Sequence, residues 1–109
     1  MIIEQIYTDN AFRNFNYLIV CTETGEAMAI DPLESELCLN RARDKGWTIT
    51  QLLNTHEHQD HIGGNDAVVA ATGAKLLAHA GAKNHIPGMD IGLKAGDSVR
   101  IGKTVELEV

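Results

Sequence analysis

Residues 49–65 of the chain read ITQLLNTHEHQDHIGGN, and they place three histidines and an aspartate directly after an apolar segment. The run Ile49–Asn54 has the apolar character of a buried β-strand. The glycines at 63 and 64 open a helical segment that runs to about Gly73. Loops at the carboxyl ends of strands carry the sites of α/β folds, so this strand–loop–helix unit predicts a functional loop.

The loop contains the donor groups that zinc prefers, imidazole nitrogen and carboxylate oxygen. On an extended backbone, His56 and His58 project to the same side and can hold one ion. Asp60 and His61 stand where the chain turns into the helix, and they can reach a second ion. A lone histidine is usually an ordinary core or surface residue, but a cluster of this kind has few structural explanations. The sequence therefore predicts two divalent metal ions; zinc is expected, with iron or manganese as alternatives.

The elements around this loop predict a mixed β-sheet with helices packed on one face. A turn at 22–25 and another at 102–103 indicate hairpins. The glycine-rich and polar stretch 79–93 is expected to be irregular. Further strands are expected at 2–7, 16–21, 26–30, 75–78, 97–101 and 104–109, with a first helix ending at Gly46.

The segment from Asp31 to Glu34 has the pattern of a helix N-terminus. Asp31 would be the N-cap, Pro32 the first helical position, and Glu34 the return partner in a capping box. The apolar face of this helix is expected to comprise Leu33, Leu37, Cys38 and Ala42.

The composition restricts the classes of function. A chain of 109 residues has the size of one domain. The net charge of −6 argues against nucleic acid as a partner, and the lack of a basic run argues against an anionic membrane. The N-terminus shows no signal-peptide pattern, so a cytoplasmic location is expected. Cys21 and Cys38 are expected to be free, buried thiols rather than a disulfide.

The segment from Thr55 to His61 resembles the HxHxDH motif of the metallo-beta-lactamase superfamily, and residues 62–65 continue the likeness. The runs 16–19, 29–32 and 91–97 are similar to the glyoxalase II-like branch of that superfamily. The resemblance extends over nearly the whole chain, but over only the amino-terminal half of the family's domain. It implies an α/β fold, half of an αββα sandwich, with the metals at one edge.

The resemblance also implies roles for individual residues. His56 and His58 would bind the first metal, and Asp60 and His61 the second. Asp60 would also be a catalytic residue. Asp31 and Thr55 would support the ligands without binding a metal. For Asp31 this role is compatible with helix capping, because one carboxylate accepts several hydrogen bonds.

The activity that the resemblance implies is hydrolysis of a small glutathione thioester, such as a hydroxyacylglutathione, by a metal-bound hydroxide. No serine or cysteine nucleophile is required, and the sequence assigns no substrate-binding residue. An iron persulfide dioxygenase, a lactonase and a β-lactamase are alternatives on the same fold.

The family's remaining ligands, including a histidine in a TPGH-like run, do not occur in this sequence. His79 and His85 match no ligand position and are expected to be loop residues, and Asp90 and Asp97 are expected to be turn residues. We therefore expect residues 1–109 to be the amino-terminal part of a truncated domain, inactive in isolation. A hypothesis of another class is a catalytically silent half-domain that forms a homo-oligomer through the exposed edge of its apolar final strand.

Overall fold

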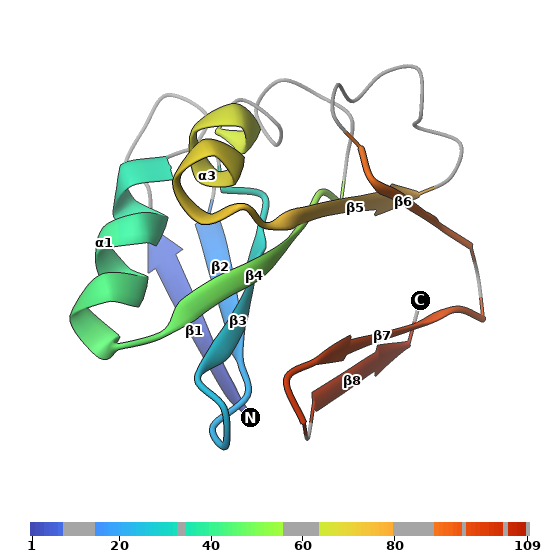
Figure 1. Ribbon diagram of the computed structural model, residues 1–109, viewed down its shortest axis with the longest axis horizontal. Helices are drawn as coiled ribbons and strands as arrows, with labels where there is room; N and C mark the ends of the chain where they lie inside the picture. Colours follow the sequence, from blue (N-terminus) through green and yellow to red (C-terminus); the bar gives the residue numbers. More distant parts are fainter. Residues whose placement is uncertain are drawn as a thin grey trace.

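The computed structural model of the chain describes residues 1–7, 15–32, 35–55, 64–79, 89–94, 96–103 and 105–108. Strands come first along the chain, strands and helices alternate in its middle, and further strands follow (Figure 1). These elements are β1 (Ile2–Tyr7), β2 (Phe15–Val20), β3 (Glu26–Ile30), α1 (Ser35–Lys45), β4 (Thr48–Leu53), α3 (Asn65–Thr72), β5 (Lys75–His79), β6 (Ile91–Leu93), β7 (Ser98–Ile101) and β8 (Val105–Glu108).

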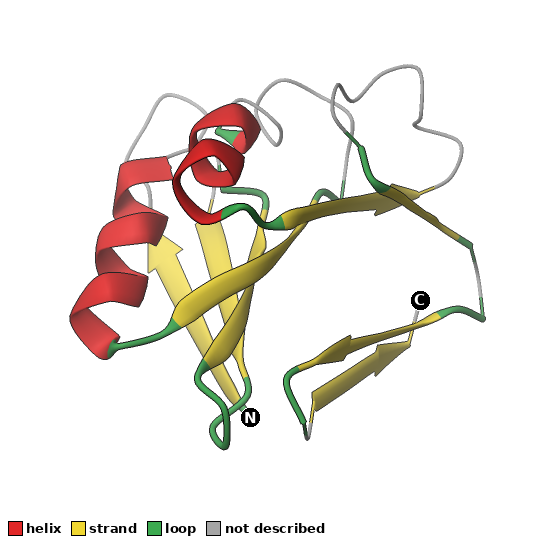
Figure 2. Cartoon of the chain, in the orientation of Figure 1, coloured by secondary structure: helices red, strands yellow, loops and turns green. Residues whose placement is uncertain are grey.

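One six-stranded sheet organises the molecule, with the strand order β1-β2-β3-β4-β5-β6. The pairs β1–β2 and β2–β3 are antiparallel, whereas β3, β4, β5 and β6 run parallel. Figure 2 shows α1 and α3 on one side of this sheet and the antiparallel β7–β8 hairpin on the other. The predicted mixed sheet with helices on one face is thereby confirmed.

Each central strand is buried on both faces because successive side chains point to opposite sides. In β3, Ala27 and Ala29 pack in the cluster on the helix side, while Met28 belongs to the cluster on the hairpin side. In β5, Leu76 packs in the cluster on the helix side and Leu77 in the cluster on the hairpin side. The sheet therefore separates two apolar cores, and the hairpin contributes Val99, Ile101 and Val105 to the second of them.

The stretch 79–93 differs from the prediction of an irregular segment. His79 is the last residue of β5, and Ile91–Leu93 forms the parallel edge strand β6, in which Ile91 pairs with Leu77. The residue before β6 is also bonded to β5: the Asp90 N–H donates to the Leu76 carbonyl oxygen at 2.8 Å. A three-residue strand centred on a glycine has no alternating pattern, so its formation depends on β5 rather than on local preference.

Helix α1 buries Cys38 and Ala42 as predicted, but Leu37 is 40% exposed and does not join the core. Neighbouring residues stand about 100° apart around a helix, so a face centred on Cys38 leaves Leu37 at its margin.

The helix begins at Ser35, and Leu33 and Glu34 lie outside the described residues. Pro32 is described and is not helical, so the prediction that it is the first helical position, with Asp31 as the N-cap, is wrong. The Asp31 carboxylate accepts hydrogen bonds from Thr55, which holds it away from the helix N-terminus. The role predicted for Glu34 stays a prediction.

Both cysteines are free and buried, as predicted. Burial raises the pKa of the Cys38 thiol from 9.0 to about 12, and it outweighs the hydrogen bond from Asn16 and the charge of Arg41, which both lower the pKa. The Cys38 thiol is therefore protonated at neutral pH and is not a nucleophile.

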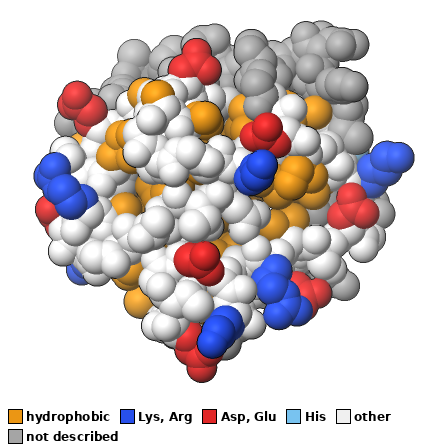
Figure 3. Space-filling model, in the orientation of Figure 1, with side chains coloured by type: hydrophobic (Ala, Val, Ile, Leu, Met, Phe, Trp, Pro, Cys, Tyr) orange, Lys and Arg blue, Asp and Glu red, His pale blue; other side chains and the backbone are white. Residues whose placement is uncertain are grey.

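The surface in Figure 3 shows basic and acidic side chains scattered over the face, with hydrophobic side chains visible between them. Both signs of charge occur on this face, so it presents no field of a single sign. In the part of the chain that the structure describes, no helix has the length and apolar character to cross a bilayer.

The hairpin turn at Gly102 predicts a large loss of stability for Gly102→Ala. The residue has φ +59, and an added methyl group would lie 2.6 Å from Cβ and 2.7 Å from Sγ of Cys21. Left-handed backbone strain and overpacking together should lower the free energy of unfolding by about 3 kcal/mol. Gly73→Ala is the matched control, because Gly73 has φ +70 and nothing lies within 4 Å of the added group. Chemical denaturation should show a loss of only about 1 kcal/mol for the control, and equal losses for both variants would contradict the packing account.

Candidate metal centre

The carboxyl ends of three parallel strands meet at one edge of the sheet. Asp31 follows β3, Asn54 and Thr55 follow β4, and His79 ends β5. Backbone hydrogen bonds hold these strand ends together: the Asp31 N–H donates to the Leu53 carbonyl oxygen, and the Asn54 N–H donates to the Leu77 carbonyl oxygen, each at 3.0 Å. This edge is where α/β folds place their functional loops, and the predicted metal-binding loop starts from it.

Asp31 is fixed in an unusual conformation directly behind that loop. It is the only non-glycine residue with positive φ among those described, at φ +48, and its side chain is buried. Its Oδ1 accepts a hydrogen bond from the Thr55 backbone N–H at 2.9 Å, and its Oδ2 accepts one from the Thr55 hydroxyl. Aspartate tolerates this backbone region better than most residues. Asp31 therefore holds the first residue of the loop by two bonds, which is the contact that a supporting role requires.

A second contact joins the two ends of the loop. The Asn54 side-chain amide donates to Oδ1 of Asn65 at 3.1 Å, and the Asn65 amide donates to Oδ1 of Asn54 at 2.6 Å. Asn54 ends the strand before the loop, and Asn65 begins α3 after it. We did not predict this pair from the sequence. The signal that could have indicated it is an asparagine at each boundary of the loop, where an apolar strand ends and an apolar helix begins.

The four predicted metal ligands, His56, His58, Asp60 and His61, lie outside the described residues. Their role as ligands stays a prediction, and the same holds for the expectation that His85 is a loop residue. Among the residues that the structure does describe, no group of three or more histidine, cysteine, aspartate or glutamate side chains could hold a metal ion. The structure describes the residues on both sides of the predicted ligands, up to Thr55 and from Gly64 onward.

The other titratable residues weighed in the sequence have different surroundings. The Asp90 carboxylate accepts a hydrogen bond from the Leu76 N–H at 2.9 Å, and the Asp97 carboxylate accepts one from the Lys94 N–H at 2.8 Å. The Asp97 bond is local, in agreement with the expected turn role, whereas Asp90 differs from that expectation because it bonds to strand β5. His79 was expected in a loop, but it ends strand β5 with an exposed side chain.

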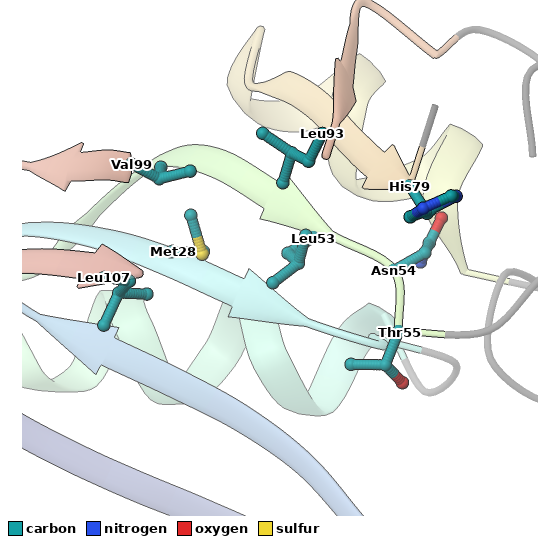
Figure 4. A pocket seen from close by; sticks show the side chains of 8 residues that line it. All are labelled: Met28, Leu53, Asn54, Thr55, His79, Leu93, Val99 and Leu107. Atoms are coloured by element: carbon teal, nitrogen blue, oxygen red, sulfur yellow. The ribbon is translucent and has the colours of Figure 1, made fainter. Parts of the chain in front are cut away.

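A cavity of about 360 Å³ lies between the six-stranded sheet and the hairpin, next to the start of the loop. At one end its polar lining residues are Asn54, Thr55 and His79, and in Figure 4 the Thr55 side chain points away from the other two. The opposite end is apolar. Its walls are the side chains of Met28, Leu53, Leu93, Val99 and Leu107.

Residues 17–98 match the family model described as the metallo-beta-lactamase superfamily. The chain belongs to the metallo-beta-lactamase superfamily. The solved structure of ETHE1 from Myxococcus xanthus is similar to it, with a TM-score of 0.82 and 30% sequence identity; the match covers 94% of this chain and 45% of that one. The α/β fold implied by the sequence resemblance is confirmed.

Two curated relatives are more similar in sequence, and both are named hydroxyacylglutathione hydrolase. The protein from Polaromonas sp. (strain JS666) is 68% identical over 108 residues, which cover 99% of this chain. The protein from Nitrosococcus oceani is 60% identical over 109 residues, which cover 100% of this chain. The chain spans 41% of the length of each of these relatives.

Proposed function

We propose that the chain supplies the amino-terminal half of a dinuclear metal centre in a hydroxyacylglutathione hydrolase. The observation that carries this proposal is the 68% and 60% identity to two proteins of that name. This similarity favours a thioester hydrolase over the dioxygenase, lactonase and β-lactamase alternatives. The substrate would be a small glutathione thioester.

The donor set fits divalent metal ions. His56 and His58 would hold one ion, and Asp60 and His61 the other, because imidazole and carboxylate are the ligands that zinc takes in catalytic sites. We propose zinc as the metal, with iron and manganese to be distinguished by elemental analysis. When bound, such ions lower the pKa of a water molecule and polarise a carbonyl group.

Residues next to the proposed ligands position the loop that carries them. The Asp31 carboxylate fixes the Thr55 backbone and hydroxyl, and so sets where the ligand segment leaves β4. The overall reaction adds water across the C–S bond and releases a hydroxy acid and the thiol of glutathione. A thiolate needs little acid assistance to leave, because thiols are much stronger acids than alcohols. Neither thiol of this chain takes part, since Cys21 and Cys38 are buried in the cores.

Two finer assignments accompany this proposal. We place the protein in a reducing compartment such as the cytoplasm, supported by its two free, buried thiols. Self-association through an exposed sheet edge stays a prediction, and a sedimentation experiment over a range of concentrations tests it. A monomer at the highest concentration would count against self-association.

A chimaera tests the proposed activity. In it, this chain replaces the 108 matched residues of the Polaromonas protein, so that the rest of the domain is supplied. We expect the chimaera to hydrolyse S-lactoylglutathione at a rate within about tenfold of the parent, a cost of about 1.4 kcal/mol in transition-state stabilisation. The isolated chain should show no turnover. The control is the same chimaera with His56→Ala and His58→Ala, which should be inactive. A folded, metal-loaded chimaera without thioester hydrolysis would refute the proposal.

A further inference from the structure

We infer that Asn54 and Asn65 are positioning residues whose paired amides close the loop between them and thereby set its affinity for metal. The inference rests on the proposed function, because it takes positions 56, 58, 60 and 61 as the ligands. It adds a role for two residues outside the metal-binding motif.

The pair is rigid and directional. The two hydrogen bonds, of 3.1 and 2.6 Å, run in opposite directions between the same two amides, so they fix the separation and also the relative orientation of the two side chains. Both residues are buried, at 3% and 4% exposure. Burial removes competition from water, so each bond holds its partner more firmly than it would at the surface.

Each amide is attached to a backbone that is itself held in place. The N–H of Asn54 donates to the Leu77 carbonyl oxygen of β5, which anchors the end of β4 to its neighbouring strand. Asn65 begins α3, where the Val68 N–H donates to the Gly64 carbonyl oxygen at 3.2 Å, and the Val68 side chain is buried in the core. The amide pair therefore links a strand to a helix across the loop, not one flexible segment to another.

Closing the loop bears on metal binding because all four proposed ligands lie between the two asparagines. A loop with fixed ends has fewer conformations than one with free ends, so less entropy is lost when its side chains converge on an ion. The Asp31–Thr55 contact restrains only the first residue of the loop. The asparagine pair joins the two ends by hydrogen bonds, directly at the boundaries of the loop.

Packing alone does not explain two buried amides at this position. An apolar pair could fill the same space, whereas an amide in the core is costly unless it is hydrogen-bonded. The reciprocal bonds satisfy both amides and make the geometry specific. This is the arrangement expected where the orientation of the loop matters, because outer contacts of this kind orient the groups that bind a metal.

Competition for Zn²⁺ against a chromophoric chelator tests the inference on the 109-residue chain itself. Asn54→Ala and Asn65→Ala should each weaken zinc affinity by about 10- to 100-fold, the usual effect of losing a residue that supports metal ligands. The matched control is Gln51→Ala. It removes another side-chain amide of β4, whose Nε2 donates to the Arg100 carbonyl oxygen of β7 at 2.7 Å and not to a residue at the ends of the loop. This control should leave the affinity unchanged.

A double variant keeps the test valid if a single substitution prevents folding. Asn54→Leu/Asn65→Leu replaces both amides by apolar groups of similar shape, a change that can leave stability nearly unaltered. The inference expects this folded variant to bind zinc at least tenfold more weakly than the wild type. Wild-type affinity in the folded double variant would overturn the inference and leave the proposed function intact. Absence of zinc binding by the wild-type chain would also overturn the inference, whereas the proposed function is tested separately by thioester hydrolysis in the chimaera.

Discussion

The His58→Ala variant is expected to bind zinc on the order of 100- to 1,000-fold more weakly than the wild-type chain. A structural zinc site with four protein ligands contributes about 10–16 kcal/mol, so one ligand corresponds to roughly 3–4 kcal/mol. The loss should be large because His56 would be left as the only proposed ligand of the first ion. Isothermal titration of the metal-free chain with Zn²⁺ measures the change directly.

His79→Ala is the matched control for this loss. His79 is a histidine at the same edge of the sheet, at the end of β5, but it is not a proposed ligand. Its replacement should leave zinc affinity within about twofold of the wild type, a difference of less than 1 kcal/mol. If the two variants lost affinity equally, the assignment of His58 as a ligand and of His79 as a bystander would be wrong.

The Asp31→Ala variant is expected to lose both stability and metal affinity. Its carboxylate accepts two hydrogen bonds from Thr55, and the residue has φ +48. Loss of hydrogen bonds to a charged acceptor, together with backbone strain in alanine, should lower the free energy of unfolding by about 3 kcal/mol. Because Thr55 is then released at the start of the loop, zinc affinity should fall about 10- to 100-fold. Urea denaturation and zinc competition measure the two effects separately.

Asp31→Asn separates the contribution of charge from that of geometry. Asparagine tolerates positive φ and retains one side-chain acceptor, so the variant should lose only about 1 kcal/mol of stability. Asp31→Ala and Asp31→Asn with identical stability and identical zinc affinity would show that the bonds to Thr55 do not support the loop.

The sequence predicted the parts of the fold that depend on local pattern. The apolar run in β4, the glycine that ends α3 and the turn between β7 and β8 each have a local signal, and each lies within two residues of its predicted place. Strand β6 could not be predicted in this way. Its three residues adopt their conformation because β5 lies beside them, and that pairing has no counterpart in the sequence of the segment itself.

The candidate site also has one part that the sequence predicted and one part that it did not. The sequence resemblance predicted that Asp31 supports the metal-binding loop, and in the structure its carboxylate accepts two hydrogen bonds from Thr55. The effect of this contact on metal binding stays a prediction. The asparagine pair escaped prediction because an amide at the end of a strand has several ordinary roles, including turn formation. The role of Asn54 becomes recognisable only in the structure, where its side chain forms two hydrogen bonds with that of Asn65.

X-ray absorption at the zinc edge on the zinc-loaded chain tests the central claim most directly, because it reports the atoms that surround the metal. If histidines 56, 58 and 61 and Asp60 are the donors, the first shell contains nitrogen and oxygen at about 2.0–2.1 Å, with the multiple scattering of imidazole rings. A shell with sulfur at about 2.3 Å would assign the metal to Cys21 or Cys38 and contradict the account.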